Sequence, residues 1–491
     1  MERKREVSPV DIADGIFREY DIRGVYGRDL TEEVAELLGR AFALYLGKRG
    51  LAGPGLTVSV GRDVRTSSGA IRDALVRGLV DSGVDCVDIG VCPTPLQYFS
   101  MHRLGADGGI MITGSHNPPE YNGFKISVGR DTIHGPEIQA LKDLVAGLAG
   151  GPTPPPPPAG RRGSLEHRAI IPDYLDYVAG GITLPELSRP IKVVLDAGNG
   201  TAGPVAPALM RRLGCDVVEL FCAADGGFPN HHPDPTVPAN LADLIEAVRG
   251  EGADFGVAYD GDADRIGVVD EGGEIIWGDR LMIIYARDIL ETTPGAVVVG
   301  EVKSSQVMYD EIAHAGGRPV MWKTGHSLIK SKMRELGAAM AGEMSGHIFF
   351  ADRYFGFDDA IYATARLVEI LAARRMADPA FGFSSLLAGV PSTHATPEIR
   401  IDCPDGEKFA VVERLRDAIG AGDTGFSVSD VITLDGVRIN FDGGWALLRA
   451  SNTQPVLVLR FEAESAHLLE RAREFVRGLL DRVRPGLWVG F

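Results

Sequence analysis

The sequence predicts an α/β protein with three similar α/β domains that contain mixed sheets, followed by a smaller C-terminal α+β domain. In three segments, an apolar run is followed by a small or polar turn, an amphipathic helix, a glycine and a second apolar run; these are residues 56–90, 191–221 and 296–322. This pattern is typical of a βαβ unit. Three such units in a chain of 491 residues, which is too long for one core, indicate separate domains.

The domain boundaries follow from composition and from a change of pattern near the C-terminus. Gly151–Gly160 contains five consecutive prolines, which favour a stiff linker. After Asp378 the pattern predicts a strand at Glu398–Asp402, a helix at Lys408–Ile419, two strands, and a long helix at Ser465–Val483. The expected parts are domain I at residues 1–151, a proline-rich linker at 152–166, domain II at 167–273, domain III at 274–385 and domain IV at 386–491.

The composition argues against several classes of partner and location. The chain has 50 basic and 67 acidic residues, a net charge of −17, whereas nucleic-acid binding requires a basic surface. No signal peptide and no apolar run of membrane-spanning length are visible. The five cysteines are scattered and form no CxxC pair, which indicates a reducing compartment. We therefore expect a cytoplasmic protein without nucleic-acid or membrane partners, as a monomer or small homo-oligomer.

A serine and a histidine follow the end of the first domain's apolar run in Met111–Glu120, MITGSHNPPE. Gly, Ser, Asn and Pro are ordinary turn residues, so one interpretation is a surface turn. The second interpretation is a reactive hydroxyl held out into a cleft. This motif alone leaves both interpretations open.

Three carboxylates alternate in Asp260–Arg265, DGDADR, between two apolar runs. In an extended loop they would project to one side, and oxygen ligands favour Mg²⁺ or Ca²⁺. An EF-hand is disfavoured because Arg265 occupies the position of the required glycine and the flanks resemble strands. A phosphatase with an aspartyl nucleophile would also carry Asp-x-Asp after a strand, and a plain acidic surface turn would need no ligand at all.

Two further polar loops have an inventory that suits a sugar phosphate. In Gly342–His347, GEMSGH, a carboxylate, a hydroxyl and an imidazole alternate, so an extended loop would offer them together to sugar hydroxyls. Arg449–Pro455, RASNTQP, provides a guanidinium, two hydroxyls and an amide for a phosphate. Without a ligand, the first would be a polar turn and the second a hairpin loop.

Together these loops resemble the α-D-phosphohexomutases, most closely the bacterial bifunctional phosphomannomutase/phosphoglucomutase enzymes. The matching stretches run in order over nearly the whole chain: FREYDIRG, MITGSHNPPEYNGFKI, DGDADRIGVV, RPVMWKTGHSLIKSKM, AGEMSGHIFF, RYFGFDDAIYATARL and RASNTQPVLVLRFEA. The resemblance implies four domains around a central active-site cleft, each contributing one loop.

The resemblance also implies a role for each site residue. Ser115 would carry the phosphoryl group, with His116, Lys125 and Arg23 as further catalytic residues. Mg²⁺ would be held by Asp260, Asp262, Asp264 and an oxygen on Ser115. The substrate-binding residues implied are Tyr20, Arg265, Lys303, Gly325, His326, Glu343, Ser345, His347, Arg449, Ser451, Asn452 and Thr453.

The implied reaction interconverts hexose 1-phosphate and hexose 6-phosphate through a phosphoserine enzyme and a hexose 1,6-bisphosphate, which also serves as activator. Mannose and glucose phosphates are the expected substrates. The competing hypotheses are a phosphoglucosamine mutase or another phosphohexomutase, an idle sugar-phosphate-binding protein and a magnesium-dependent phosphatase. Two positions depart from the family pattern. Ala263 stands where relatives often have glycine, but all three carboxylates remain, so we expect metal binding to survive; Gln454 precedes the final proline at a position without an expected role.

Overall fold

The computed structural model describes residue 10 and residues 12–51, 53, 55–150, 161–420, 426–452 and 454–487. The proline run of the expected linker lies outside the described residues. The chain forms two compact units, which are treated separately below. The first unit consists of Met1–Gly278 and Ser345–Leu386, and the second of Asp279–Met344 and Leu387–Phe491. None of the described helices is both long and apolar enough to cross a membrane.

The N-terminal sheet of the first unit is mixed and contains the predicted βαβ unit. Its order is β1-β5-β4-β2-β3-β7, with β6 paired to β5. The strands β2, β3 and β4 are parallel, whereas β5 runs antiparallel to β4 and β1. The strand bounds are β1 Ile22–Val25, β2 Thr57–Arg62, β3 Asp85–Val91, β4 Gly108–Ile112, β5 Tyr121–Val128, β6 Asp131–Thr132 and β7 Leu165–His167.

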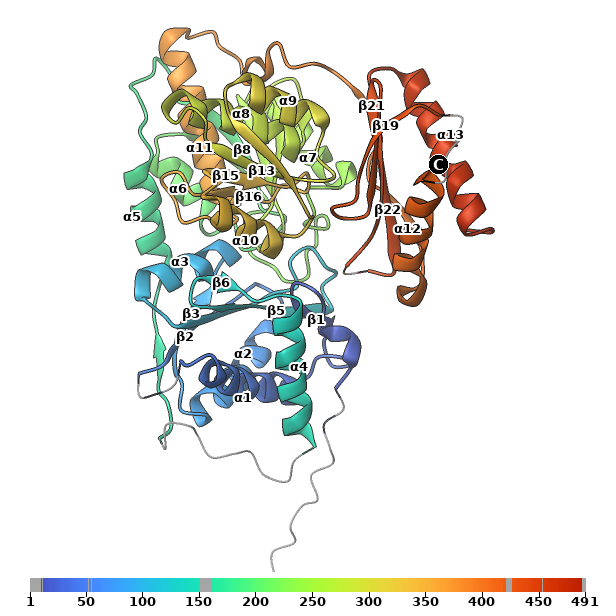
Figure 1. Ribbon diagram of the computed structural model, residues 1–491. Coiled ribbons are helices and arrows are strands. Elements are labelled where there is room, and N and C mark those ends of the chain that lie inside the picture. The colour runs from blue at the N-terminus through green and yellow to red at the C-terminus, as the bar shows by residue number, and fades with distance from the viewer. Residues whose placement is uncertain are drawn as a thin grey trace, which may run out of the picture. The chain divides into compact units, whose positions relative to one another are not determined.

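Helices cover both faces of this sheet. Figure 1 shows α1, α2 and α4 on one face and α3 on the other. Their bounds are α1 Glu32–Lys48, α2 Ser68–Asp81, α3 Thr94–Leu104 and α4 Pro136–Ala149. The helices α1, α2 and α4 pack their buried aliphatic and aromatic side chains against the strands in one core. The core fixes the carboxyl end of β4, where the Met111–Glu120 loop begins.

The second sheet of the first unit positions the acidic loop. Its order is β12-β11-β10-β8-β9, with β8, β9 and β10 parallel and β11 antiparallel to β10. The bounds are β8 Lys192–Asp196, β9 Asp216–Leu220, β10 Phe255–Tyr259, β11 Ile266–Asp270 and β12 Ile275–Ile276. The helices of this region are α5 Ile171–Gly181, α6 Ala206–Arg212 and α7 Ala242–Glu251. The predicted strands on both sides of the acidic loop are confirmed.

The first unit also contains β16 (Ile348–Phe350) and α11 (Ala360–Ala377). The side chain of Asp359 caps α11, because it accepts a hydrogen bond from the Tyr362 amide at 2.8 Å. The same carboxylate accepts hydrogen bonds from the hydroxyls of Tyr174 and Tyr354, at 3.0 and 2.7 Å. Burial raises the pKa of Asp359 to about 6 despite these donors. The start of α11 is therefore fixed to α5.

In the second unit, β13 pairs in parallel with β14 on one side and with β15 on the other. These strands and their helices contain the third predicted βαβ unit. The bounds are α8 Gly278–Thr292, β13 Val297–Glu301, α9 Gln306–His314, β14 Arg318–Trp322, α10 His326–Leu336 and β15 Met340–Gly342.

The C-terminal part of the second unit is an antiparallel sheet with α12 and α13 packed on one face (Figure 1). Its elements are β17 His394–Ala395, β18 Ile399–Asp402, α12 Asp405–Gly420, β19 Val428–Ile432, β20 Val437–Phe441, β21 Gly444–Ala450, β22 Val456–Ala463 and α13 Ala466–Val483. The helix predicted at Ser465–Val483 is present as Ala466–Val483, and Ser465 caps it, with its hydroxyl accepting from the Leu468 amide. The prediction of only two strands before that helix is wrong, because β19 and β20 form an additional hairpin. Its signal was present in the Asp435–Gly436 pair, a strong hairpin turn sequence.

Candidate active site

The phosphoserine candidate lies just beyond the end of β4 in a left-handed conformation. Ser115 has φ of 49°, and its side chain is buried. Its hydroxyl donates a hydrogen bond to Asp260 Oδ2 at 2.8 Å, and its Oγ lies 3.1 Å from His116 Nδ1. Burial, together with the charges of Arg265, Arg23 and Lys125, lowers the pKa of His116 well below its usual range. His116 is therefore neutral near pH 7.

A buried arginine that the sequence analysis did not select holds this loop. The Arg65 guanidinium donates to four main-chain carbonyls: Ser115 at 2.8 Å, Asn117 at 2.6 Å, Pro118 at 2.5 Å and Tyr121 at 3.0 Å. Asp63 accepts from Arg65 Nε and also from the Gly114 amide, each at 3.0 Å. A Cβ at Gly114 would collide with the guanidinium. The loop conformation therefore depends on Arg65.

Arg23 approaches the same loop from β1. Its guanidinium donates to Asn117 Oδ1 at 2.6 Å, to the Gly114 carbonyl at 3.2 Å and to Asp21 at 2.6 Å. Tyr20 lies in the segment before β1 and is buried. The two loop residues that Arg23 contacts, Gly114 and Asn117, therefore lie one and two positions from Ser115 in the sequence.

The acidic loop is a turn and not the extended segment that the alternation predicted. The amides of Asp264 and Arg265 both donate to Asp260 Oδ1 at 3.1 Å, and Ala263 has φ of 57°. The turn brings one oxygen of each of Asp260, Asp262 and Asp264 within 4.8 Å of the others. The three carboxylates therefore converge as expected, but the turn brings them together and not an extended loop.

The carboxylates of this turn suit a divalent cation. Asp262 Oδ1 and Asp264 Oδ1 are buried and have no hydrogen-bond partner among the residues that the structure describes. Burial and repulsion from Asp264 and Asp262 raise the pKa of Asp260 well above its usual range. Carboxylates that repel one another and keep oxygens without a hydrogen-bond donor are the ligands that a hard cation uses.

Lys125, on β5, compensates the charge of the turn. Its Nζ donates to Asp262 Oδ2 at 2.7 Å and also to Asp264 Oδ2. Although burial lowers the pKa of the ammonium group, Asp262 and Asp264 raise it well above its usual range. Burial raises the pKa of Asp262, but Lys125 outweighs it and holds that pKa well below its usual range. Thr94 adds a hydrogen bond to Asp262 Oδ2 at 2.5 Å.

The left-handed conformation of Ala263 leads to a stability prediction. A side chain at this φ costs about 1–2 kcal/mol, which glycine avoids. Ala258, in the preceding strand β10, is buried like Ala263 and serves as the comparison. Ala263→Gly should therefore lower the free energy of unfolding by less than Ala258→Gly does. We expect a difference of about 1 kcal/mol between the two variants in urea unfolding. An equal loss in both variants would show that Ala263 is unstrained.

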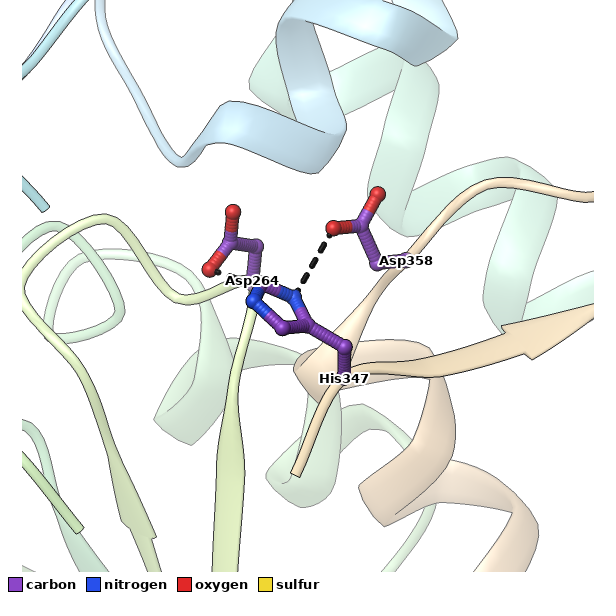
Figure 2. Close-up of side chains that lie close together, drawn as sticks. All are labelled: Asp264, His347 and Asp358. Carbon is purple, nitrogen blue, oxygen red and sulfur yellow. Dashed lines mark ion pairs between the residues drawn. The ribbon is translucent and has the colours of Figure 1, made fainter. Parts of the chain in front are cut away.

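A second cluster beside the metal turn contains Asp264, His347 and Asp358 (Figure 2). His347 Nδ1 lies 2.9 Å from Asp358 Oδ2 and 3.6 Å from Asp264 Oδ1, while His347 Nε2 accepts a hydrogen bond from Arg265 Nε at 2.9 Å. The proton of a neutral His347 therefore lies on Nδ1, between two carboxylates. An imidazole next to a carboxylate, as in His347 and Asp358, can hold or move a proton.

Asp358 was missed by the sequence analysis, although its DD pair stands in the RYFGFDDA stretch. The GEMSGH loop is also a turn and not extended. Gly346 has φ of 92°, and a Cβ there would collide with the Ile266 carbonyl. The half-buried Ser345 precedes it in this turn.

In the second unit, Glu301 connects several of the predicted substrate-binding loops. It accepts from Thr324 Oγ1 at 2.6 Å and from the Met344 amide at 2.9 Å, and it lies 3.6 Å from Lys303 Nζ. Lys303 also donates to Glu398 at 3.1 Å and lowers the pKa of that carboxyl to about 2. Glu301 and Glu398 were not selected from the sequence, because the contacts that join the loops, from Glu301 to Thr324 and Met344 and from Glu398 to Lys303, are between residues far apart along the chain.

The loop that contains Glu343 contacts the loop that precedes His326. Glu343 is buried, and its Oε1 accepts from the Gly325 amide at 2.6 Å. Gly325, with φ of 129°, precedes His326, the first residue of α10. The structure therefore brings the KTGHS and GEMSGH motifs together through a buried carboxylate and a backbone amide.

The RASNTQP motif spans the last two residues of β21 and the hairpin loop that leads to β22. Arg449 Nε donates to Asp435 at 3.1 Å, and the same oxygen accepts from the Thr324 amide at 3.0 Å. Ser451 accepts from the Gln454 amide at 3.2 Å. Asn452 is half-buried in this loop, and Thr453 lies outside the described residues.

Four family models match the chain in order. They are described as phosphoglucomutase/phosphomannomutase alpha/beta/alpha domains I, II and III and the C-terminal domain, and they match residues 14–147, 172–273, 277–380 and 398–479. A phosphomannomutase/phosphoglucomutase of Pseudomonas aeruginosa is 47% identical over 476 residues, which is 97% of each chain. A phosphoglucomutase of Neisseria gonorrhoeae is 43% identical over 97% of this chain and 99% of its own.

Solved structures show the same likeness. A phosphoglucomutase/phosphomannomutase family protein from Burkholderia thailandensis superposes with a TM-score of 0.88 at 42% identity, covering 98% of this chain and 100% of the other. An N-acetylglucosamine-phosphate mutase has a TM-score of 0.61 at 14% identity, covering 96% and 97% of the two chains, and it shares the fold alone.

Proposed function

Because the chain belongs to the phosphoglucomutase/phosphomannomutase family, whose enzymes are isomerases, we propose that it interconverts hexose 1-phosphates and hexose 6-phosphates. Its proposed substrates are mannose and glucose phosphates, the sugars in the names of its relatives. The observation that carries the proposal is the 2.8 Å hydrogen bond from Ser115 Oγ to Asp260. It places a hydroxyl directly against the metal-binding turn, with the ammonium group of Lys125 on the same turn.

Ser115 is the proposed phosphoryl carrier. Phosphoryl transfer depends mainly on positioning and on stabilisation of charge. The phosphoserine gives its phosphoryl group to the free hydroxyl of a hexose monophosphate, so that the sugar O–P bond forms and the serine O–P bond breaks. The resulting 1,6-bisphosphate reorients and returns its other phosphoryl group to Ser115, which leaves the isomeric monophosphate.

The charges of the turn support this transfer. Mg²⁺ held by Asp260, Asp262, Asp264 and an oxygen on Ser115 would withdraw charge from the transferring group. Lys125 supplies a fixed positive charge beside the acidic turn, and Arg23 supplies one beside the Ser115 loop. Both are buried, so their charges are weakly screened by solvent and act strongly on a dianionic phosphate.

The pair of His347 and Asp358 is the proposed acceptor for the proton of the attacking hydroxyl: His347 Nε2 takes up this proton in place of the hydrogen bond from Arg265, while the Nδ1 proton stays toward Asp358. In the reverse direction it returns that proton. The lowered pKa of His116 makes this side chain a weak proton acceptor at neutral pH. Its Nδ1 lies 3.1 Å from Ser115 Oγ, where it can orient the serine oxygen. Arg265 donates to His347 and thereby fixes the orientation of the ring.

The second unit supplies the proposed substrate-binding groups. Glu343 would bind sugar hydroxyls, and His326 and Lys303 would add donors; binding of a sugar hydroxyl is also the role proposed for Ser345 in the first unit. The phosphate that is not transferring would be bound by the hairpin loop residues Arg449, Ser451, Asn452 and Thr453. The same phosphate site must serve both substrate orientations, because each turnover presents the 1-phosphate and the 6-phosphate in exchanged places.

A ³¹P NMR time course tests the function. Purified protein is mixed with Mg²⁺, mannose 1-phosphate and a trace of glucose 1,6-bisphosphate, and then with glucose 1-phosphate or glucosamine 1-phosphate instead. We expect conversion of the mannose and glucose compounds to the 6-phosphates without inorganic phosphate. Faster conversion of glucosamine phosphate would favour a phosphoglucosamine mutase. Release of inorganic phosphate would favour a phosphatase, and an unchanged spectrum would favour an idle binding protein.

Asp358→Asn tests the proton-transfer proposal. The amide keeps the shape but removes the carboxylate that His347 Nδ1 faces at 2.9 Å, so we expect kcat to fall by about 10²-fold, with KM changing little. Steady-state kinetics with glucose 1-phosphate measure both constants. Asp173→Asn, which alters only surface pairs with Arg103 and Arg168, is the control. A kcat within twofold of wild type in the Asp358 variant would contradict the assignment.

A further inference from the structure

We propose that the segment of residues 225–235, DGGFPNHHPDP, is a positioning element that fixes the phosphoserine loop relative to the metal-binding turn, and that Phe228 acts through Arg65. The inference rests on the proposed role of Ser115. The segment lies between β9 and α7 and contains none of the proposed catalytic or substrate-binding residues. It goes beyond that function because it assigns the segment a part in the reaction.

One end of the segment packs on Arg65. The Phe228 ring is buried, and its centroid lies 5.2 Å from the Arg65 guanidinium carbon, within the range of a cation–π contact. Two residues earlier, a Cβ at Gly226 would lie 2.7 Å from Arg65 Cα. The segment therefore approaches both the main chain and the side chain of the residue that holds the Ser115 loop.

The other end packs on the metal-binding turn. Gly261 stands between Asp260 and Asp262, and a Cβ there would lie 2.5 Å from the Ser115 carbonyl oxygen and 3.4 Å from Pro233 Cγ. The turn is thus in contact with the Ser115 backbone on one side and with Pro233 of the 225–235 segment on another. A side chain larger than hydrogen at this position would separate the two loops.

A contact between a half-buried histidine and a buried carboxylate anchors this end. His231 Nε2 lies 3.0 Å from Asp196 Oδ2 at the end of β8, and its Nδ1 lies 3.0 Å from the His232 carbonyl. A Cβ at Gly198 would lie 2.9 Å from Pro233 Cβ and 3.4 Å from His231 Cε1. His231 and Pro233 therefore sit in a closely packed contact with the loop that follows β8.

Backbone conformation sets this region apart from the rest of the described chain. Six described residues other than glycine have positive φ, and four of them lie in these loops: Ser115, Asn199, Phe228 and Ala263. A fifth, Phe221, accepts a hydrogen bond from the Asn199 amide at 2.8 Å. Each such conformation costs about 1–3 kcal/mol and persists only where the surroundings enforce it. The packing described above provides that enforcement, which makes the assembly rigid.

Rigidity matters here because phosphoryl transfer tolerates little displacement. A shift of about 1 Å in a reacting group can lower the rate by about 10²-fold. Phe228 does not touch the reacting atoms, so its loss should change the position of Ser115 while leaving the substrate-binding groups of the second unit intact. The predicted signature is therefore a lower kcat at nearly constant KM.

The test compares two substitutions at one position. Phe228→Leu keeps an apolar side chain but removes the ring face, whereas Phe228→Tyr keeps the ring. We expect Phe228→Leu to lower kcat by about tenfold, with KM within twofold of wild type, and Phe228→Tyr to restore kcat to within twofold. Phe426→Leu is the matched control, because Phe426 lies 5.6 Å from the Arg471 guanidinium in the C-terminal region and should leave kcat unchanged.

A second measurement does not depend on activity. In metal-free protein, hydrogen exchange of the peptide covering residues 111–121 should be faster in Phe228→Leu than in wild type, while the thermal midpoint changes little. Unchanged exchange together with unchanged kcat would overturn the inference, as would equal loss of kcat in the Leu and Tyr variants. If wild-type protein acquires no phosphate on Ser115 from glucose 1,6-bisphosphate, the proposed function itself fails; normal labelling with an unaffected Phe228→Leu variant rejects only the present inference.

Discussion

Ser115→Ala is expected to lower mutase turnover by roughly 10³-fold or more, because it removes the only oxygen that the proposed reaction phosphorylates on the enzyme. The substitution deletes the hydrogen bond to Asp260 but leaves the four carbonyl contacts of Arg65 in place. The loop should therefore keep its shape. We expect sugar-phosphate binding, measured by titration calorimetry with glucose 1-phosphate, to stay within about threefold of wild type.

The control for this variant is Ser127→Ala on β5, which removes another buried serine hydroxyl in the same sheet. Its turnover should match wild type. Mass spectrometry after exposure to glucose 1,6-bisphosphate should find one phosphate on wild type and on the control, and none on the Ser115 variant. Substantial turnover by Ser115→Ala, or loss of binding together with turnover, would contradict the assignment of Ser115 as carrier.

The architecture around the two key loops was predictable from local patterns. The strand, turn, helix and strand order at residues 56–90, 191–221 and 296–322 is visible in the sequence because buried strands and amphipathic helices have distinct periods. The loops at Ser115 and Asp260 follow strands for the same reason. Their internal shape was not predictable, since the left-handed conformation of Ala263 depends on hydrogen bonds to Asp260 that the alternation of carboxylates does not reveal.

The residues that the sequence analysis missed share one property, which is that their function depends on distant partners. Arg65 binds carbonyls about fifty residues away, and Asp358 meets the metal turn through His347. Neither lies in a motif whose chemistry is evident alone. Spacing along the chain identifies groups that act locally, whereas buried ion pairs between loops require the folded structure.

A comparable arrangement occurs in the second unit, where arginines hold the loop that carries Lys303. Arg438 donates to the carbonyls of Val302 and Ser304 at 2.6 and 2.9 Å, and Arg460 donates to that of Lys303. The Trp445 ring lies 3.9 Å from the Arg438 guanidinium carbon. Both units thus fix a functional loop through a buried guanidinium that binds main-chain carbonyls and contacts an aromatic ring. A guanidinium suits this task because its five donors can satisfy several carbonyls at once.

Lys125→Met is expected to have the other large effect, on stability as well as on turnover. In the metal-free protein the ammonium group compensates Asp262 and Asp264, so its removal leaves two buried carboxylates without a cation. Removing one partner from a buried pair costs about 3–5 kcal/mol. The variant should therefore unfold at lower temperature in EDTA, and turnover should fall by about 10²-fold or more because a charge beside the transferring group is lost.

Magnesium should reverse the stability effect but not the loss of turnover. A cation that binds only the folded turn stabilises it by mass action, and in Lys125→Met it no longer competes with the ammonium group for the carboxylate oxygens. Calorimetric scans across a Mg²⁺ titration should thus show a larger rise of the thermal midpoint in the variant than in wild type. Lys142→Met, which alters an exposed pair with Asp14, should behave as wild type. The double variant Lys125→Met with Asp262→Asn should regain part of the lost stability in EDTA, because one of the two uncompensated charges is removed. A double variant as unstable as the single one would show that Lys125 contributes packing and not charge.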